Sequence, residues 1–363
     1  MKIITQTLEH SEPSLASLAD VVYFDIETTG LSSARNQIYL IGCALHDAGS
    51  WTLTQWFDNT GREEKEIISS FLLYISGRKT LIHYNGDRFD IPFLLKRMEV
   101  HGLAGQLPRM NSIDLRKEVT PYRDLIGLPN CSQQAVESLF GTGRTDDTDG
   151  GSLIGVYRSY VEKPDPDALS MLLTHNAEDV RGLISLTPVL SFHDLPEAKL
   201  HVYKAEAHSY RGYLGDEKEE LLLHFRSDKA IPVMITGSYD HVFLSQTGAE
   251  GLLRIPVYRE EMKYFYAGYK DYYYLPEEDC AMHKSIASFA DASHRVQATA
   301  QTCYTRKKSL YLPQWSDFKS PYFRREYQDP ELFFELTDEM KRDRDFFCSY
   351  ADYLFRRILK NGK

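Results

Sequence analysis

The feature that most constrains the fold is the alternation of short apolar runs with helical patterns in the first half of the chain. Four runs are rich in strand formers: 21–24, 38–45, 51–57 and 80–83. Three stretches place apolar side chains at helical spacing: 62–75, 91–100 and 167–190. Strands that lead and then alternate with helices predict an α/β domain on a largely covered sheet.

The length of 363 residues predicts two domains, because single hydrophobic cores stop growing near ~250–300 residues. Pro196 ends the last helical pattern of the first half, so we place a hinge at 191–197. We therefore expect a first domain over 15–192 and a smaller α+β domain over 197–363.

Composition narrows the class of protein. Hydrophobic residues make up 42% and charged residues 26%, as in folded globular proteins, and no apolar run reaches the ~18 residues of a membrane helix. Residues 1–20 contain three acids and no apolar core, so we expect no signal peptide. The five cysteines form no Cys-x-x-Cys pair, which predicts reduced, structural thiols in a cytoplasmic protein.

Four acidic residues stand where predicted strands end or a predicted helix presents them. Asp25 and Glu27 follow the first apolar run at spacing i, i+2, which puts both carboxylates on one face of a strand. Asp90 follows the fourth run at the start of a helix. Asp179 lies four residues after His175, on the same helix face. Crowded carboxylates repel each other unless a cation neutralises them, and their oxygens suit Mg²⁺ or Mn²⁺. A divalent-metal site is therefore expected.

Three segments resemble the exonuclease motifs of the DEDD superfamily of 3′→5′ exonucleases, an RNase H-like fold. They read Asp-Ile-Glu-Thr-Thr-Gly at 25–30, Asn-Gly-Asp-Arg-Phe-Asp at 85–90 and His-Asn-Ala-Glu-Asp at 175–179. Phe140-Gly141, the segment 150–154 and His175-Asn176 give the nearest resemblance to the bacterial stand-alone YprB-type branch. The resemblance implies an RNase H-like mixed sheet flanked by helices and a metal-dependent 3′→5′ exonuclease. Its expected partner is nucleic acid with a single-stranded 3′ end.

The resemblance also implies a role for each motif residue. Asp25 would bridge two divalent metal ions, Glu27 and Asp179 would hold the ion that activates water, and Asp90 would support the second. His175 would orient or deprotonate the attacking water.

Substrate contacts follow from the same motifs. Thr28, Thr29 and Gly30 would turn around the terminal nucleotide, where a glycine lets the backbone come close. Asn85 would contact the substrate from the second motif.

Several alternatives remain open from the sequence. His175 stands four residues before the last acid, where the superfamily has Tyr, and Thr174 occupies the His position, so His175 could be an ordinary helix-face histidine. Asp90 could cap the helix that follows it. Asp114 ends another short strand and could support the site from behind. The chain could also be an inactive RNase H-fold binding or regulatory protein, or an RNase H-like endonuclease or integrase.

The second half has a different character. Residues 1–190 contain 17 basic and 25 acidic residues, whereas 191–363 contain 25 and 27. The segment 284–325 carries eight basic and two acidic residues and lies beside the seven tyrosines of 258–274. Single-strand binding uses such charges together with base stacking of ~1–3 kcal/mol per base. We expect the basic run Arg306, Lys307 and Lys308 to bind substrate. The alternative is that the tyrosines simply pack a sheet.

Secondary structure in the second half is predicted more coarsely. Five strands are expected: 221–225, 233–236, 241–245, 252–258 and 264–274. One or two amphipathic helices are expected over 330–360.

Overall fold

The computed structural model describes residues 1–8, 20–47, 49–142, 150–212, 215–287, 289, 291–316 and 318–361. The chain divides into two compact units, Met1–Leu195 and Pro196–Lys363. Residue 15, where the first domain was expected to begin, and most of 1–20 lie outside the described residues. None of the described helices combines the length and apolar character that a membrane crossing requires.

The first unit is built on a six-stranded mixed sheet in the order β1-β4-β3-β2-β5-β6. The pairs β1–β4, β4–β3 and β3–β2 are antiparallel, and β2–β5 and β5–β6 are parallel. The strands are β1 Lys2–Leu8, β2 Val21–Thr28, β3 Ile38–Asp47, β4 Ser50–Phe57, β5 Thr80–His83 and β6 Asn111–Asp114. The sequence did not predict β1, but the mixed α/β sheet is confirmed.

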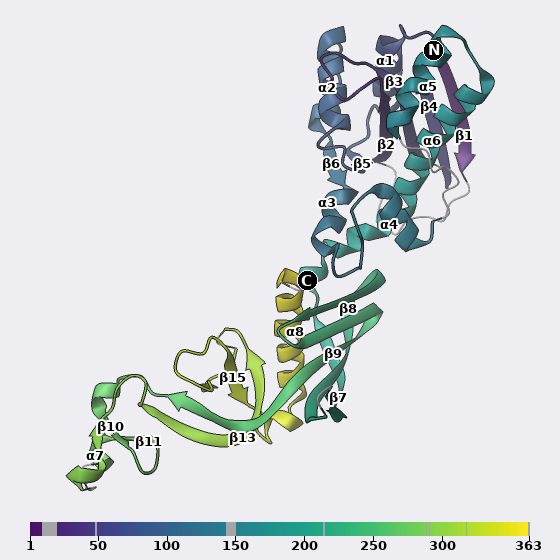
Figure 1. The fold of residues 1–363 in the computed structure, drawn as a ribbon. Helices are drawn as coiled ribbons and strands as arrows, with labels where there is room; N and C mark the ends of the chain where they lie inside the picture. Colours follow the sequence, from purple (N-terminus) through teal and green to yellow (C-terminus); the bar gives the residue numbers. More distant parts are fainter. Residues whose placement is uncertain are drawn as a thin grey trace. The chain divides into compact units, whose positions relative to one another are not determined.

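Helices cover both faces of this sheet, with α1 and α2 on one side and α5 and α6 on the other (Figure 1). The helices are α1 Glu64–Tyr74, α2 Asp90–His101, α3 Leu115–Val119, α4 Gln133–Phe140, α5 Gly150–Glu162 and α6 Pro166–Ser185. Four 3₁₀ turns join them: Leu107–Arg109, Thr120–Tyr122, Thr187–Phe192 and Leu195–Glu197. The helical pattern of 167–190 is therefore α6 followed by a 3₁₀ turn.

The pleat of β2 gives its two faces different tasks. Val22, Phe24 and Ile26 are buried in the core shared with α1 and α2. The alternate residues Tyr23 and Asp25 point to the α6 side, where the Tyr23 hydroxyl lies 2.9 Å from Thr187 Oγ1. Because β2 extends to Thr28, Asp25 and Glu27 lie near the end of this strand, and both face α6, as the i, i+2 spacing predicts.

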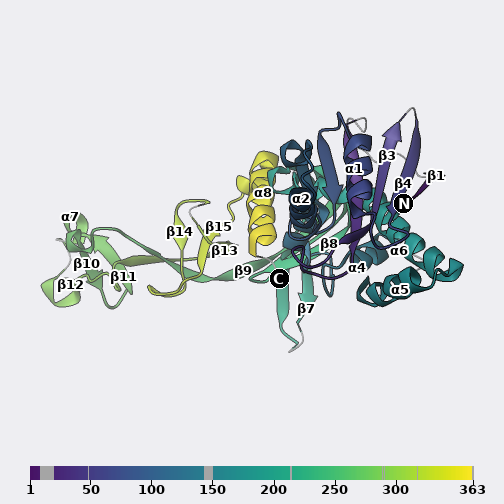
Figure 2. The same cartoon turned by 90° about the horizontal axis from the view of Figure 1, so that it is seen from above.

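The second unit contains an antiparallel sheet in the order β14-β15-β13-β9-β8-β7, packed on the C-terminal helix α8. Strands β9 and β13 continue away from α8 to a small sheet of order β11-β10-β12 (Figure 2). The elements are β7 Leu200–Arg211, β8 Glu217–Tyr239, β9 Val242–Phe265, β10 Tyr272–Leu275, β11 Cys280–His283, α7 Lys284–Ala287, β12 Val296–Gln297, β13 Tyr304–Gln314, β14 Tyr322–Phe323, β15 Leu332–Glu335 and α8 Arg344–Asn361. Three short 3₁₀ turns complete it: Tyr269–Asp271, Ala292–His294 and Met340–Arg342.

Several expectations for this unit are wrong in detail. The strands expected at 241–245 and 252–258 are both parts of β9, and the strand expected at 264–274 is the end of β9, a 3₁₀ turn and β10. The short strands expected at 221–225 and 233–236 belong to the single strand β8, whose pairing with β9 is irregular between Arg226 and Ile235. The helical reading of 330–360 fails at its start, because Phe333 and Phe334 are buried in β15. The second half of that segment forms a helix as expected, α8.

Candidate active site

Two of the predicted acids project from β2 toward α6. The Asn176 side chain donates from Nδ2 to Asp25 Oδ2 at 3.0 Å. His175 Nε2 lies 3.8 Å from Glu27 Oε1. The i, i+2 pair of β2 therefore meets two consecutive residues of α6, His175 and Asn176.

α6 brings the histidine and the last acid to the same place. The helix begins where Asp165 caps it, its carboxylate accepting from the Ala168 amide at 3.2 Å. Two turns further on, His175 Nε2 lies 3.3 Å from Asp179 Oδ2. One ligand atom each from Glu27, His175 and Asp179 fit within 4.8 Å of one another. These three side chains could therefore share a bound ion or water.

Asp90 reaches the same region from α2. It is buried, and its Oδ1 accepts from the Ile26 amide of β2 at 3.3 Å. The alternative that Asp90 caps its helix is wrong, because Phe89 holds the cap position and Asp90 is the first helical residue. Its carboxylate is thus turned to the strand that carries Asp25 and Glu27. We call Asp25, Glu27, Asp90 and Asp179 the acid cluster.

The pKa values of Asp25 and Asp90 reflect the burial of these side chains and the other carboxylates nearby. Burial and then the charges of Asp179, Asp90 and Glu27 hold the pKa of Asp25 well above its usual range. Burial also raises the pKa of Asp90 to about 7, although hydrogen bonds from its own backbone and from Ile26 oppose the rise. The neighbouring acids therefore make Asp25 and Asp90 harder to ionise while no cation is bound.

The donor set fits divalent cations. In the parts of the chain that are described, no Lys or Arg forms an ion pair with Asp25 or Asp90. Buried carboxylates that are not neutralised by the protein are costly, and hard oxygen donors are what Mg²⁺ and Mn²⁺ take. The acid cluster is therefore suited to hold such ions.

Asn176 is a site residue whose role sequence reasoning missed. It is fully buried, and its Oδ1 accepts from Gln55 Nε2 of β4 at 3.0 Å while its Nδ2 donates to Asp25. The space it fills exists because Gly42 of β3 has no side chain: a Cβ there would lie 2.0 Å from Asn176 Oδ1. A glutamine and a glycine inside apolar strands were the available signals.

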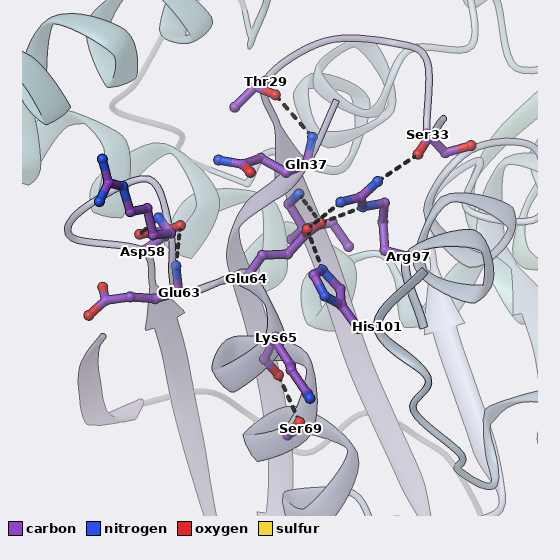
Figure 3. A network of polar contacts seen from close by, with 12 residues as sticks. Thr29, Ser33, Gln37, Asp58, Glu63, Glu64, Lys65, Ser69, Arg97 and His101 are labelled. Atoms are coloured by element: carbon purple, nitrogen blue, oxygen red, sulfur yellow. Dashed lines mark hydrogen bonds and ion pairs between the residues drawn. The ribbon is translucent and has the colours of Figure 1, made fainter. Parts of the chain in front are cut away.

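The loop after β2 carries the predicted turn around the terminal nucleotide. Thr28 Oγ1 donates to the Gly30 carbonyl at 3.1 Å. The Thr29 amide donates to the Gln37 carbonyl at 2.9 Å, and the Gln37 amide returns a bond to Thr29 Oγ1 at 3.1 Å (Figure 3). A Cβ on Gly30 would lie 2.8 Å from Asn36 Oδ1, so only glycine fits this closed loop.

A buried ion-pair network holds the far side of that loop (Figure 3). Glu64 of α1 accepts from Arg97 Nε at 2.8 Å and from Arg97 Nη2 at 2.6 Å, and its Oε2 lies 2.7 Å from His101 Nε2. Glu64 also accepts from the Ile38 amide at 2.8 Å, and Arg97 donates to the Ser33 carbonyl at 3.2 Å. The loop is therefore tied to α1 and α2 through one carboxylate.

Asn85 sits at the end of β5 in a left-handed conformation, with φ of 62°. Its amide donates to Asp114 Oδ1 at 2.8 Å, and its side-chain Oδ1 accepts from Arg116 Nη1 at 3.0 Å. Asp114, expected to support the site from behind, is buried and fixes Asn85 directly.

Arg306, Lys307 and Lys308 lie in the second unit, on β13. Arg306 forms ion pairs with Glu261 at 3.0 Å and Asp279 at 3.3 Å, and Lys307 pairs with Glu335 at 2.6 Å. Lys308 is exposed and has no ion pair within the described ranges. Substrate binding by this run stays a prediction, with two of its three charges engaged by acids.

The first unit has an RNase H-like fold, and the acid cluster lies on its elements β2, α2 and α6. Residues 22–191 match the family model described as the RNase_H superfamily, so the first unit is an RNase H-like domain. Over 206 residues the chain is 29% identical to the protein YprB of Bacillus subtilis (strain 168). That match covers 55% of this chain, and the chain spans about half (49%) of that relative's length. The expected RNase H-like, YprB-type resemblance is confirmed.

Solved structures give more distant likenesses. The family B DNA polymerase of Pyrobaculum calidifontis is 18% identical with a TM-score of 0.38, over 48% of this chain and 24% of that chain. NrnC of Brucella melitensis bound to pGG is 18% identical with a TM-score of 0.32, over 48% and 72%. A complex of E. coli exonuclease I with single-stranded DNA is 14% identical with a TM-score of 0.28, over 57% and 54%.

Proposed function

We propose that this protein is a metal-dependent 3′→5′ exonuclease that hydrolyses phosphodiester bonds of nucleic acid from the 3′ end. The observation that carries the proposal is the convergence of Asp25, Glu27, Asp90 and Asp179 beside His175. These residues come from β2, α2 and α6 of an RNase H-like domain.

Each residue has a proposed task. Asp25 would bridge two divalent ions, Mg²⁺ or Mn²⁺, with Glu27 and Asp179 on one and Asp90 on the other. Bound there, such ions would polarise the phosphodiester and stabilise the attacking and leaving oxygens. Asn176 holds the Asp25 carboxylate in one orientation through the bond to Oδ2. An oriented carboxylate needs no rearrangement when the substrate arrives.

His175 is placed to handle the water. Its Nε2 faces Glu27 and Asp179, the two acids proposed to lie nearest the nucleophile. In hydrolysis the water oxygen forms a bond to phosphorus, the bond from phosphorus to the 3′ oxygen breaks, and His175 takes up the proton that water loses. The geometry favours this role over that of an ordinary helix-face histidine, which would point to solvent.

The preference for a 3′ end is proposed from the loop after β2 and from Asn85. Thr28, Thr29 and Gly30 form a closed turn held by Gln37, and Asn85 is held by Asp114. Both would border the terminal nucleotide. The second unit is proposed as an accessory domain that positions the strand.

An inactive binding protein of the same fold is the main alternative. It is disfavoured because all four acids and His175 are present and converge, whereas a binding role needs no such costly group of carboxylates. An endonuclease would share the acids, so substrate polarity decides between the two activities.

The test is degradation of single- and double-stranded RNA and DNA with Mg²⁺, Mn²⁺ or chelator. A 5′-labelled strand should shorten stepwise with metal and stay intact with chelator. A 3′-terminal phosphate should stop the reaction, and a 5′ block should not. Internal fragments from circular single strands would assign the site to an endonuclease. If no substrate is cleaved with either metal, the proposed activity is wrong and the alternative of an inactive binding protein is supported.

A further inference from the structure

A basic pocket lies in the first unit next to Asn85. It has a volume of about 300 Å³ and is lined by Arg88, Arg116 and Lys117, with Asn85 and Asp114 at its wall. The residues come from the turn between β5 and α2 and from α3. We call it the Arg88 pocket. Nothing in the proposed chemistry uses its cations.

The charges of the pocket differ in how they are satisfied. Lys117 is ion-paired with Asp87. Asp114, the one acid in the wall, accepts on Oδ1 from the Asn85 amide at 2.8 Å and from the Arg116 amide at 3.1 Å. Arg88 is exposed, and neither it nor Arg116 forms an ion pair with any residue that the structure describes. The pocket therefore presents two guanidinium groups whose charge no carboxylate partner takes up.

One side of the pocket is fixed by hydrogen bonds among Asn85, Arg116 and Asp114. Arg116 Nη1 donates to Asn85 Oδ1 at 3.0 Å, which turns the Asn85 amide nitrogen, a donor, away from that contact. Asn85 itself is held in its left-handed conformation by the buried carboxylate of Asp114. Two guanidinium groups and an amide donor match the oxygens of a phosphate group.

The pocket and the acid cluster share one short segment of chain. The turn 85–90 begins at Asn85, where the Arg88 amide donates to the Asn85 carbonyl at 3.1 Å, and ends at Asp90. Only six residues, 85–90, separate the pocket wall from the acid cluster along the chain, and the Ile91 amide also donates to the Gly86 carbonyl at 2.9 Å within this turn. An anion in the pocket would lie beside the acids without competing for them.

We propose that the Arg88 pocket binds a backbone phosphate of the substrate strand on the 5′ side of the scissile bond. This inference rests on the proposed function. An enzyme that removes the terminal nucleotide holds the last phosphodiester at the acid cluster, so every other phosphate of the strand lies on its 5′ side. The pocket then supplies the attraction for phosphate that a unit with 17 basic and 25 acidic residues over 1–190 lacks overall.

Arg88→Gln tests the pocket, because Arg88 is exposed and its side chain supports no other residue in the described structure. Binding is measured by fluorescence anisotropy with chelator present and no cleavage, using a labelled dinucleotide and single strands of three to twelve nucleotides. The variant should weaken binding of the longer strands about tenfold, leave the dinucleotide unchanged, and lower the log–log salt slope by about 0.7. Arg88→Lys should restore part of the affinity and the full salt slope, because it keeps the charge but not the planar set of donors.

The matched control is Lys65→Gln, an equal loss of charge at an exposed residue of α1 outside the pocket. It should change neither affinity nor slope. Three results would contradict the proposed phosphate site. Arg88→Gln and Lys65→Gln could weaken binding equally, Arg88→Gln could weaken binding of the dinucleotide as much as that of longer strands, or Arg88→Gln could have no effect on binding. Because binding is read without metal or cleavage, an intact length-dependent effect in a protein that degrades nothing would support the pocket and reject the proposed function alone.

Discussion

Arg88 and Arg116 in the first unit and Arg306 and Lys307 in the second carry the same charge in different surroundings. In the first unit the two guanidinium groups line a pocket without a carboxylate partner. In the second, antiparallel pairing of β13 with β9 and β15 brings an acid to Arg306 and to Lys307. A count of basic residues along the sequence therefore does not tell which of these charges are available to bind a phosphate. Acidic residues on the neighbouring strands determine how much of the positive charge on β13 remains available to bind a phosphate.

Asp25→Asn should produce the largest effect. It tests catalysis separately from substrate binding. Degradation should fall by on the order of 10³-fold, the scale on which single electrostatic groups act in catalysis. Without metal, the variant should be slightly more stable than the parent, because it removes one of several buried, mutually repelling carboxylates. Activity is read from strand shortening and stability from urea unfolding with chelator. Full activity would contradict the assignment of Asp25.

Glu64→Gln compares a buried ion pair of the first unit with an exposed one of the second. The Arg97 and Glu64 side chains are 11% and 4% exposed, so leaving Arg97 unpaired should cost roughly 3 kcal/mol of unfolding free energy. Glu261→Gln, which breaks the pair with the 35% exposed Arg306, should cost under ~1 kcal/mol. Equal losses of unfolding free energy in the two variants, measured by urea unfolding, would contradict this difference between the buried and the exposed ion pair.

The effect of Glu64→Gln should also depend on pH. Burial alone would raise the pKa of Glu64, but hydrogen bonds from Arg97, His101 and the Ile38 amide lower it below its usual value. A depressed folded pKa gives stability that is present above the unfolded pKa of about 4.3 and lost as pH falls through the lower folded value. The difference between parent and variant should shrink below about pH 4.

Asn176→Ala should lower kcat by about 10- to 100-fold and raise the Mn²⁺ concentration needed for half-maximal activity. Both effects are expected because the variant loses the hydrogen bond that orients Asp25, a proposed metal ligand. KM for nucleic acid should stay within about twofold. Asn361→Ala, on the exposed end of α8, is the control and should change neither quantity. A rise in KM alone would mean that Asn176 serves substrate binding instead.

Neutralising Arg306, Lys307 and Lys308 together should have the smallest effect. If the whole run binds phosphate, KM rises and the salt slope falls by about 0.7 for each contact. The ion pairs of Arg306 and Lys307 lead us to expect a change of at most one contact, supplied by Lys308. A fall in slope of about 1.4 to 2.1, which corresponds to two or three contacts, would show that the ion pairs open for substrate and that the second unit is the main phosphate-binding surface.

The first half of the fold could be predicted because its signals are local. The apolar run before Asp25 predicts a strand, and the alternation of β2 between Val22, Phe24 and Ile26 on one side and Asp25 on the other follows from the pleat. Strand β1 escaped prediction since its side chains are mostly exposed and only its pairing with β4 defines it.

Other features depend on contacts between residues far apart in the chain. The hydrogen bond between the Gln55 and Asn176 side chains joins residues that are 121 positions apart, so no local sequence pattern predicts it. The irregular pairing within β8 made one long strand resemble two short ones. Phe333 and Phe334 fit a helix pattern as well as a strand, and only packing in the sheet with β13 decides.

The most direct test of the account is Mn²⁺ binding, followed by electron paramagnetic resonance, for the full chain and for Asp25→Asn. We expect about two bound ions per chain in the parent, in line with a two-metal site, and fewer or more weakly bound ions in the variant. Arg88→Gln should bind Mn²⁺ like the parent, because its pocket is separate from the acid cluster. A parent that binds no Mn²⁺, or a variant that binds it equally well, would contradict the claim that Asp25, Glu27, Asp90 and Asp179 form a metal site.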